Sequence, residues 1–476
     1  MASIEIPNVL ASRYASAPMR RIWSATEKIR LERALWIAVM KAQRELGLDI
    51  PAAAIAAYER VRDDVNLERI AERERALRHD VKARIEEFCA LAGHEHIHKG
   101  LTSRDLTDNV EQMQTRDAMI LVRDKYVSVL RHVRALAECY AGLPIAARTH
   151  NVAAQPTTVG RRFAMFGQEM LVAFRHLEST LERYSLRGIT GAVGTALDQL
   201  TLFGGDAAKV AQLNERVMAR LGFSSRLIAT GQVYPRSLDY EVVAALYQLA
   251  AGPASFCRTL RLMAGHELAG EGFKEGQVGS SAMPHKMNSR SCERVCGFLA
   301  ILNGYLNMTA ALAGDQWNEG DVSCSVVRRV AIPDAFFAID GMLETFLTVL
   351  NEMGVNGPVV QTELRRYLPF LATTTILMEA VKRGAGREQA HEAVKRHAIA
   401  VARAMREGGQ RDNDLAQRLG EDPAIPLNSV EIEAILSDAG AFLGAAKEQT
   451  LAFCAAVDAI IAGHPAAAAY EPGEIL

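Results

Sequence analysis

Three polar stretches hold most of the residues in this sequence whose types and spacing could do chemistry. The densest runs from Gly276 to Val295, GQVGSSAMPHKMNSRSCERV, and combines paired serines with a histidine, a lysine and an asparagine. It lacks helical and strand periodicity, so it is predicted to be a loop. The apolar spacing beyond it predicts a helix with Ser289 or Ser291 as N-cap. Surface loops on a rigid scaffold often carry catalytic groups, although many are only exposed turns.

The paired serines in this loop, Ser280 and Ser281, are either turn formers or reactive hydroxyls, because Lys286 follows at a distance that a folded loop can bring back to them. Glycine and polar residues from about Gly272 to Ser289 leave few apolar contacts to hold the loop in place. We therefore expect the loop to be open without ligand and to close over a bound substrate.

A second polar stretch lies earlier in the chain, in LRHDVKARIEEF and GHEHIHKGLTSRDLTDN. Its alternating histidines His94, His96 and His98 could bind a metal ion, but no carboxylate or thiolate completes the set, so no metal is expected. Thr102 and Ser103 precede a long helical pattern, and their hydroxyls with the first amides of that helix could bind an anion. The alternative is a row of solvent-facing histidines before an ordinary helix cap.

The third stretch, ARTHNVAAQPTTVGRRF, places His150 in a break between helices. A lone histidine is more often structural than catalytic, but imidazole titrates near neutrality and commonly carries a proton in catalysis. Weaker candidates stand in RYAS, in ATGQVYPRSLDYEV and in QWNEGDVSCSVVRRV, where arginines alone would indicate only a solvated surface. These weaker candidates are Arg13, Tyr14, Gln232, Ser325 and Arg329.

The elements that must position these stretches are helices. Residues 101–141 contain neither glycine nor proline and repeat apolar residues at intervals of three and four, which predicts one helix of roughly 45 Å or more. Ser24 and Glu27 form a capping-box pattern before another helix, which Gly47 ends. Further helical patterns cover 161–184, 238–268, 293–313, 335–352, 388–407 and 439–462.

Alternating runs of β-branched residues are nearly absent, so the fold is predicted to be all-α. The lengths of the helices favour an elongated central bundle from about 111 to 364. A smaller N-terminal helical domain over 1–110 and a C-terminal helical domain over 365–476 are expected to flank it.

The composition limits the classes of function. The chain has 476 residues, 49% of them hydrophobic, which is enough for a large core. Its 54 basic and 56 acidic residues exclude a bulk attraction to nucleic acid or to an anionic membrane, so an anionic ligand needs local arginines and lysines. The sequence shows no signal-like start and no apolar run of membrane-spanning length, which predicts a cytoplasmic protein. Seven scattered cysteines are expected to be reduced and mostly buried.

In combination, GSSAMPHKMN at 279–288, RTH at 148–150, GLTS at 100–103 and RHD at 78–80 resemble the signature stretches of the fumarase/aspartase superfamily. Within it, RYAS, IHKGLTS, RTH followed by QPTT, TGQVYPR, SSAMPHK with SCERV, and LPFLATT at 369–375 are similar to the adenylosuccinate lyases. The resemblance covers nearly the full chain. It implies a homotetramer with shared active sites, a succinylated purine nucleotide as substrate, fumarate as product, and no metal or organic cofactor.

The resemblance also implies which residues move protons. Ser280 is the expected base, with its alkoxide stabilised by Lys286 and loop amides once closure excludes water. His150 is the expected acid, which protonates the leaving nitrogen. Breaking the C–N bond requires removal of a proton from the carbon beside a carboxylate, so positive charge and hydrogen-bond donors must stabilise the carbanion that results.

Other residues carry expected supporting roles by the same resemblance. His79 and His98 are expected to orient the substrate or His150, and Glu293 to hold a catalytic partner. Arginine forks and hydroxyls suit a ligand with one phosphate and two carboxylates. The expected substrate contacts are Arg13, Tyr14, Arg78, Asp80, Thr102, Ser103, Gln232, Asn288, Arg294, Ser325 and Arg329.

The chain departs from the family pattern at two points. Many relatives have KRNP where this sequence has KMNS at 286–289, so the loop exit lacks an arginine and a proline. Many also have an arginine where Gly320 follows Glu319. One phosphate or carboxylate contact is therefore missing or supplied from elsewhere.

Two kinds of alternative function compete with this interpretation. Argininosuccinate cleavage, fumarate hydration and carboxymuconate cycloisomerisation keep the mechanism and change the substrate, but TGQVYPR and RHD argue against them. A helical scaffold without activity is the other alternative, since fold alone never proves catalysis. The presence of Ser280, Lys286 and His150 argues against the scaffold.

Overall fold

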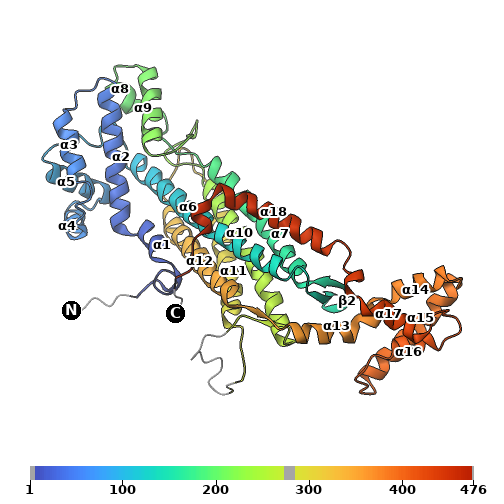
Figure 1. Cartoon of the computed structure of the whole chain (residues 1–476). Coiled ribbons are helices and arrows are strands. Elements are labelled where there is room, and N and C mark those ends of the chain that lie inside the picture. The colour runs from blue at the N-terminus through green and yellow to red at the C-terminus, as the bar shows by residue number, and fades with distance from the viewer. Residues whose placement is uncertain (1–5, 273–282, 284, 474–476) are drawn as a thin grey trace.

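Long helices that lie side by side form the body of the molecule (Figure 1). The structure is a computed structural model that describes residues 6–272, 283 and 285–473. The fold is all-α, as predicted. The helices of this body pack against one another along a common direction, and they are α6 (Ser103–Cys139), α7 (Val159–Glu182), α10 (Ser237–Gly265), α11 (Arg290–Ala310) and α12 (Cys324–Glu352).

The bundle forms because these helices carry wide apolar faces. α6 is the predicted long helix, and it buries apolar residues at helical spacing over its whole length. Every residue from 335 to 347 in the middle of α12 is buried, as expected of a helix in the centre of a core, and most of these residues are apolar. The buried apolar residues of α6 include Leu106, Val110, Met113, Val122, Tyr126, Leu130 and Val133.

A second group of helices covers the bundle end at which α6 begins (Figure 1). A π-helical turn at Leu10–Tyr14 leads into them, and α9 packs on α2. The Ser24 hydroxyl accepts a hydrogen bond of 3.1 Å from the Glu27 amide, which confirms Ser24 as the cap of α2. These helices are α1 (Ala17–Ile22), α2 (Ala25–Glu45), α3 (Ala52–Arg60), α4 (Leu67–Leu77), α5 (Asp80–Ala92), α8 (Leu197–Leu202) and α9 (Ala207–Arg220).

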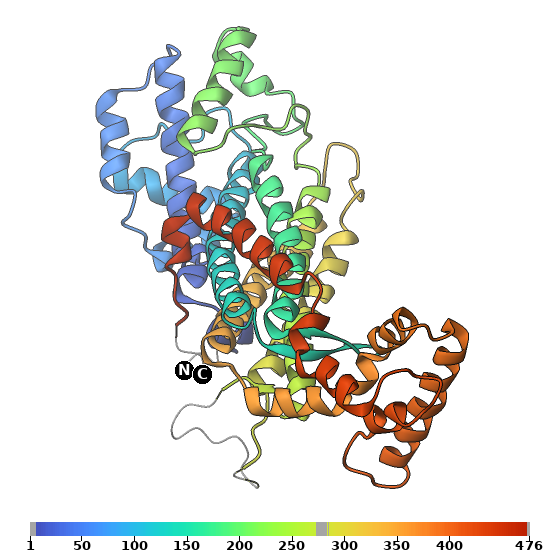
Figure 2. The same ribbon diagram turned by 45° about the vertical axis from the view of Figure 1, so that its right-hand side comes forward.

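Another group of short helices projects from the opposite end of the bundle (Figure 2). They share a separate apolar core that includes Ile376, Leu419 and Ile432. The chain then returns, and α18 (Ala446–Gly463) packs along α6 and α7, followed by α19 (Pro465–Ala468). The projecting group consists of α13 (Gly357–Leu371), α14 (Thr373–Lys382), α15 (Arg387–Arg406), α16 (Leu415–Gly420), α17 (Ser429–Ser437) and a 3-10 turn at Ala439–Phe442.

The division of the chain into domains at 110 and 364 stays a proposal. Residue 110 lies inside α6 and residue 364 lies inside α13, so neither proposed boundary falls in a linker. No helix in the described part of the chain has both the length and the apolar character needed to cross a bilayer.

A buried ion cluster joins both terminal segments to the middle of the bundle. The Lys125 ammonium contacts Asp340 and lies 2.5 Å from a Glu344 carboxylate oxygen, and all three side chains are buried. The Ser16 amide donates to Asp340 at 2.6 Å. Tyr470 donates its hydroxyl hydrogen to Glu344, and the amide at residue 473 donates to the same carboxylate at 2.8 Å.

Two short antiparallel pairs of strands interrupt the helices. β1 (Pro144–Thr149) and β2 (Val152–Thr158) form a hairpin, and β3 (Ala269–Gly270) pairs with β4 (Gly354–Val355). Thr149 pairs with Val152, so the hairpin turn consists of His150 and Asn151, with φ of 51° and 61°. Two consecutive left-handed residues define the turn that matches the twist of paired strands. The sequence predicted only a break between helices here, and the hairpin was missed.

Candidate active site

Two groups of predicted site residues lie at opposite ends of the bundle. Thr102 and Ser103 stand where α6 begins, whereas the hairpin with His150 follows the end of α6. A helix of 37 residues is about 55 Å long, at 1.5 Å per residue. One chain therefore cannot bring His150 to Thr102. We call the two regions the Thr102 end and the His150 end.

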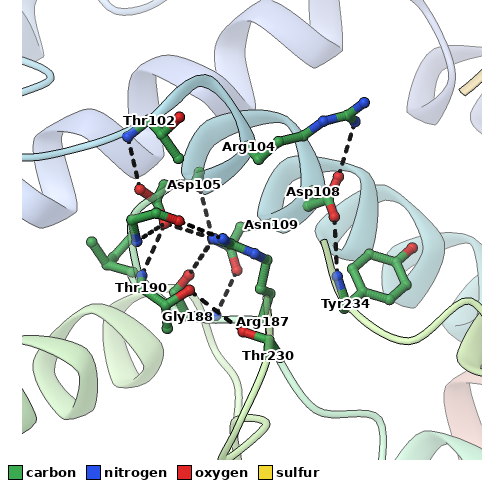
Figure 3. Close-up of polar contacts among 12 residues, drawn as sticks. Thr102, Arg104, Asp105, Asp108, Asn109, Arg187, Gly188, Thr190, Thr230 and Tyr234 are labelled. Atoms are coloured by element: carbon green, nitrogen blue, oxygen red, sulfur yellow. Dashed lines mark hydrogen bonds and ion pairs between the residues drawn. The ribbon is translucent and has the colours of Figure 1, made fainter. Parts of the chain in front are cut away.

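At the Thr102 end, a buried carboxylate ties a loop to the first turn of α6 (Figure 3). One oxygen of Asp105 accepts hydrogen bonds from Arg187 Nη1 at 2.6 Å, from the Thr190 amide at 2.9 Å and from the Gly191 amide at 3.1 Å. The other oxygen accepts from the Thr102 amide at 2.8 Å. Asp105 and Arg187 are both fully buried, so this pair fixes the backbone of the candidate anion site.

Asp105→Ala is expected to lower the free energy of unfolding by about 3–5 kcal/mol, because it leaves the Arg187 charge buried without its partner. Denaturant unfolding followed by circular dichroism measures the change. Asp105→Asn keeps the shape and some of the acceptor capacity, so it should cost less. Equal stability of Asp105→Ala and the unchanged protein would contradict this role.

A second buried network positions the segments that carry Gln232 and Ser325. Asp108 accepts from Arg104 at 3.2 Å, from Arg236 at 3.1 Å and from the Tyr234 amide at 3.4 Å. The Gln232 amide donates to the Glu319 carbonyl at 2.6 Å, and Arg104 donates to the Ser325 hydroxyl at 3.3 Å. Three segments far apart in the sequence thus meet at the Thr102 end.

Arg328 supports this network from α12. Its guanidinium contacts Asp239 at 2.7 Å and Glu111 at 2.6 Å. Burial alone would raise the pKa of Glu111, but the positive charges of Arg328 and Lys28 lower this pKa to about 2. Glu111 is therefore ionised at neutral pH.

His98 also lies at the Thr102 end, and its imidazole is neutral. Burial lowers the pKa of His98 to about 4, so the ring carries no charge at neutral pH. Trp36 Nε1 donates to Nδ1 of His98 at 3.1 Å, which leaves the ring proton on Nε2. His98 can therefore donate one hydrogen bond to a ligand, which suits the predicted orienting role.

The RHD segment forms the connection between α4 and α5. Arg78 ends α4 in a left-handed conformation with φ of 53°, and His79 caps α5 by accepting from the Lys82 amide at 3.2 Å. Asp80 pairs with Arg84 at 2.6 Å. His79 is close enough to His98 to contribute to lowering the pKa of His98, so this segment belongs to the Thr102 end.

At the His150 end, the imidazole is exposed at the tip of the hairpin. Arg148 stiffens the turn by donating to the Asn151 carbonyl at 3.2 Å, and it also pairs with Glu363 of α13. A cavity of 590 Å³ lies beside the hairpin, lined by Arg161, Arg162 and His266 among others. None of these three was predicted as a site residue, and the cavity lies far from the Thr102 end.

The loop with the paired serines returns to the bundle at the start of α11. Ser280 and Ser281 lie outside the described residues, while Lys286 is exposed. Ser289 occupies the N-cap position of α11 without a capping side-chain bond. The cap is instead the Glu271 carboxylate, which accepts from the amides of residues 291 and 292 at 3.1 and 3.0 Å.

Three predicted substrate contacts gather farther along α11. The Arg294 guanidinium lies 5.8 Å and the Arg13 guanidinium 5.9 Å from the centre of the Tyr14 ring. Tyr14 packs edge-on against Phe298 at 5.1 Å. Glu293 is exposed and lies 3.6 Å from Arg261.

Sequence reasoning missed the buried residues that position the Thr102 end. Only the spacing of Thr102 and Asp105, which fits a capping box, gave a local signal. The others meet partners more than eighty positions away, which no local pattern reveals. The missed residues are Arg104, Asp105, Asp108, Arg187, Arg236 and Arg328. In the described part of the chain, no group of three or more histidine, cysteine, aspartate or glutamate side chains could hold a metal ion.

Comparisons with known proteins place the chain in a family. Residues 11–303 match the protein family described as lyase, and residues 369–453 match the one described as adenylosuccinate lyase C-terminus. The adenylosuccinate lyases of Saccharomyces cerevisiae and Schizosaccharomyces pombe are each 34% identical to this chain, over 93% of it and 93% of their own length.

Solved structures share the fold at lower identity. A 3-carboxy-cis,cis-muconate lactonizing enzyme from Pseudomonas putida aligns with a TM-score of 0.80 at 20% identity, over 95% of this chain and 99% of that chain. A fumarate lyase from Mesorhizobium sp. BNC1 aligns with a TM-score of 0.78 at 21% identity, over 93% of this chain and 98% of that chain. At this identity, the likeness concerns the fold alone.

The helical bundle and its family match define a lyase of the fumarase/aspartase superfamily. The C-terminal match and the close relatives narrow this class. The chain belongs to the adenylosuccinate lyase family. The family, the fold class and the enzyme class predicted from the sequence are thus confirmed.

Proposed function

We propose that this lyase acts in purine nucleotide biosynthesis and eliminates fumarate from two succinylated substrates. Adenylosuccinate gives AMP, and the succinylated aminoimidazole carboxamide ribotide gives the free carboxamide ribotide. The observation that carries this proposal is identity of 34% to adenylosuccinate lyases over 93% of the chain. The cationic and hydroxyl groups at the Thr102 end suit the phosphate and carboxylates of such substrates.

The proposed mechanism is a β-elimination with separate base and acid. Ser280 removes the proton from the carbon beside a carboxylate, and His150 protonates the nitrogen as the C–N bond breaks. The exposed position of His150 supports this role, because the imidazole is free to enter a site built by other segments. Lys286, also exposed, supplies the positive charge that stabilises the Ser280 alkoxide in this mechanism.

The remaining residues bind and orient the substrate in this proposal. The imidazole of His98 donates from Nε2, and His79 lies beside it. Glu293, at the first turn of α11, holds a catalytic partner. The proposed substrate contacts are Arg13, Tyr14, Arg78, Asp80, Thr102, Ser103, Gln232, Asn288, Arg294, Ser325 and Arg329.

We also propose that the enzyme is a cytoplasmic homotetramer with shared active sites. The separation of about 55 Å between the Thr102 end and the His150 end supports sharing, because a site with both groups needs at least two chains. A symmetric assembly of long helices can place one end of a chain beside the opposite end of its neighbour.

Fumarate release from purified protein tests the substrate. We expect release from adenylosuccinate and none from argininosuccinate, measured by the absorbance of fumarate in separate assays. Release from argininosuccinate alone would favour the other lyase activity, and release from neither would favour a scaffold without catalysis. A Ser280→Ala variant is the control for contaminating enzyme.

A further inference from the structure

Arg104 holds an electrostatically unusual position at the Thr102 end. It is the second residue of α6, and its side chain is only 12% exposed. The N-terminus of a helix carries partial positive charge, so a cation in the first turn is unfavourable unless an anion offsets it. Asp108 is the one carboxylate that pairs with Arg104 among the residues that the structure describes, and Arg104 shares it with Arg236.

The charged side chains around Arg104, with Arg104 included, carry one more positive charge than negative charge. Each pair in the network is joined by a direct contact. Ser325 and Arg329 lie four residues apart on α12 and thus share a face, so Arg329 adds a further cation at its exposed edge. The five cations are Lys28, Arg104, Arg187, Arg236 and Arg328, and the four carboxylates are Asp105, Asp108, Glu111 and Asp239.

Unused hydrogen-bond donors point to the same deficit of negative charge. Arg236 is 5% exposed, and its Nε and Nη1 atoms have no hydrogen-bond partner among the described residues. This guanidinium shares Asp108 with Arg104. A buried donor without a partner is costly unless a ligand satisfies it.

The chain cannot carry a side chain at Gly320 without strain. Gly320 has φ of 133°, a conformation that side chains rarely adopt, and a Cβ atom there would lie 2.9 Å from Val233 Cγ2. Val233 is buried and follows Gln232, whose amide is bonded to the Glu319 carbonyl. Residue 320 therefore contributes no side chain to this part of the site.

We infer that Arg104 binds the phosphate of the nucleotide substrate, together with the Ser325 hydroxyl. The inference rests on the proposed function and adds a specificity-determining residue to it. Arg104 reaches Ser325 at 3.3 Å, so its guanidinium already lies beside a proposed substrate contact. A guanidinium fork beside a hydroxyl and the amides of a helix N-terminus is the chemistry that binds phosphate.

The contribution of the phosphate can be isolated by comparing AMP with adenosine. Titration calorimetry on the full-length protein gives the Kd of each ligand. The Kd of adenosine divided by the Kd of AMP measures how much the phosphate adds to the affinity. In Arg104→Met, we expect this ratio to fall roughly tenfold to a hundredfold, with adenosine binding unchanged. Arg104→Lys keeps the charge without the guanidinium fork, so its Kd ratio should lie between those of the unchanged protein and Arg104→Met.

Arg123→Met is the matched control, since Arg123 lies on the same helix and pairs at 2.8 Å with Asp124. It should keep the ratio of the unchanged protein. An unchanged ratio in Arg104→Met would overturn the inference, as would an equal loss of AMP and adenosine, which would mark Arg104 as purely structural. Failure of the unchanged protein to release fumarate from adenylosuccinate would contradict the proposed function itself.

Discussion

Replacing His150 with asparagine is expected to lower kcat by about a hundredfold to ten-thousandfold while the fold stays intact, because the variant loses the proposed acid. Asparagine is chosen because it tolerates the left-handed conformation that His150 adopts at φ of 51°. The side chain is exposed, so its replacement leaves no cavity. Steady-state fumarate release and thermal unfolding measure the two outcomes.

Asn151→Gly is the control for the turn. It keeps the imidazole and suits the second left-handed position, with φ of 61°. Its kcat should stay close to that of the unchanged enzyme. A His150→Asn enzyme with full turnover would remove His150 from the mechanism, whatever the stability of the variant.

Mixed tetramers of two impaired variants are expected to recover about a quarter of the activity of the unchanged enzyme. His150→Asn removes the proposed acid at one end of the bundle, and His79→Asn removes an imidazole at the other. Asparagine can replace His79 as the cap of α5. Random assembly gives an intact His150 and an intact His79 to a shared site in about one case out of four.

The measurement needs dissociation, equal mixing, reassembly and native mass spectrometry to prove mixed composition. Mixed tetramers that stay as inactive as either parent would contradict shared sites. The same mixing with Ser280→Ala in place of His79→Asn measures whether different chains supply His150 and Ser280. Each variant reassembled alone is the control.

Much of the helical architecture could be predicted because apolar residues recur at helical spacing within each segment. The helix expected over 101–141 runs from Ser103 to Cys139. The start expected at 335 was wrong, because α12 begins at Cys324 and continues through Pro333, a residue that usually marks a boundary. The start expected at 439 was also wrong, since Gly444, with φ of 51°, separates a short turn from α18.

The candidate site was less predictable, because its geometry depends on contacts between distant segments. The motifs identified His98 and Ser325, and the structure places both at the Thr102 end. The motifs gave no sign of the pair formed by Asp105 and Arg187, which lie 82 positions apart in the sequence. The hairpin at His150 escaped notice because its turn residues are a histidine and an asparagine, and glycine is absent from the turn.

The buried cluster around Lys125 imposes an order on biosynthesis. A ribosome reaches Tyr470 only 126 residues after Glu344, so during that interval the Glu344 carboxylate can pair with Lys125 but lacks its hydroxyl and amide donors from the C-terminal segment. A buried carboxylate that lacks some of its hydrogen-bond donors is costly, so the bundle is expected to be less stable until the C-terminal segment packs against it. Completion of the core thus depends on the C-terminal segment, and a chain interrupted before Tyr470 is expected to unfold more readily than the complete one.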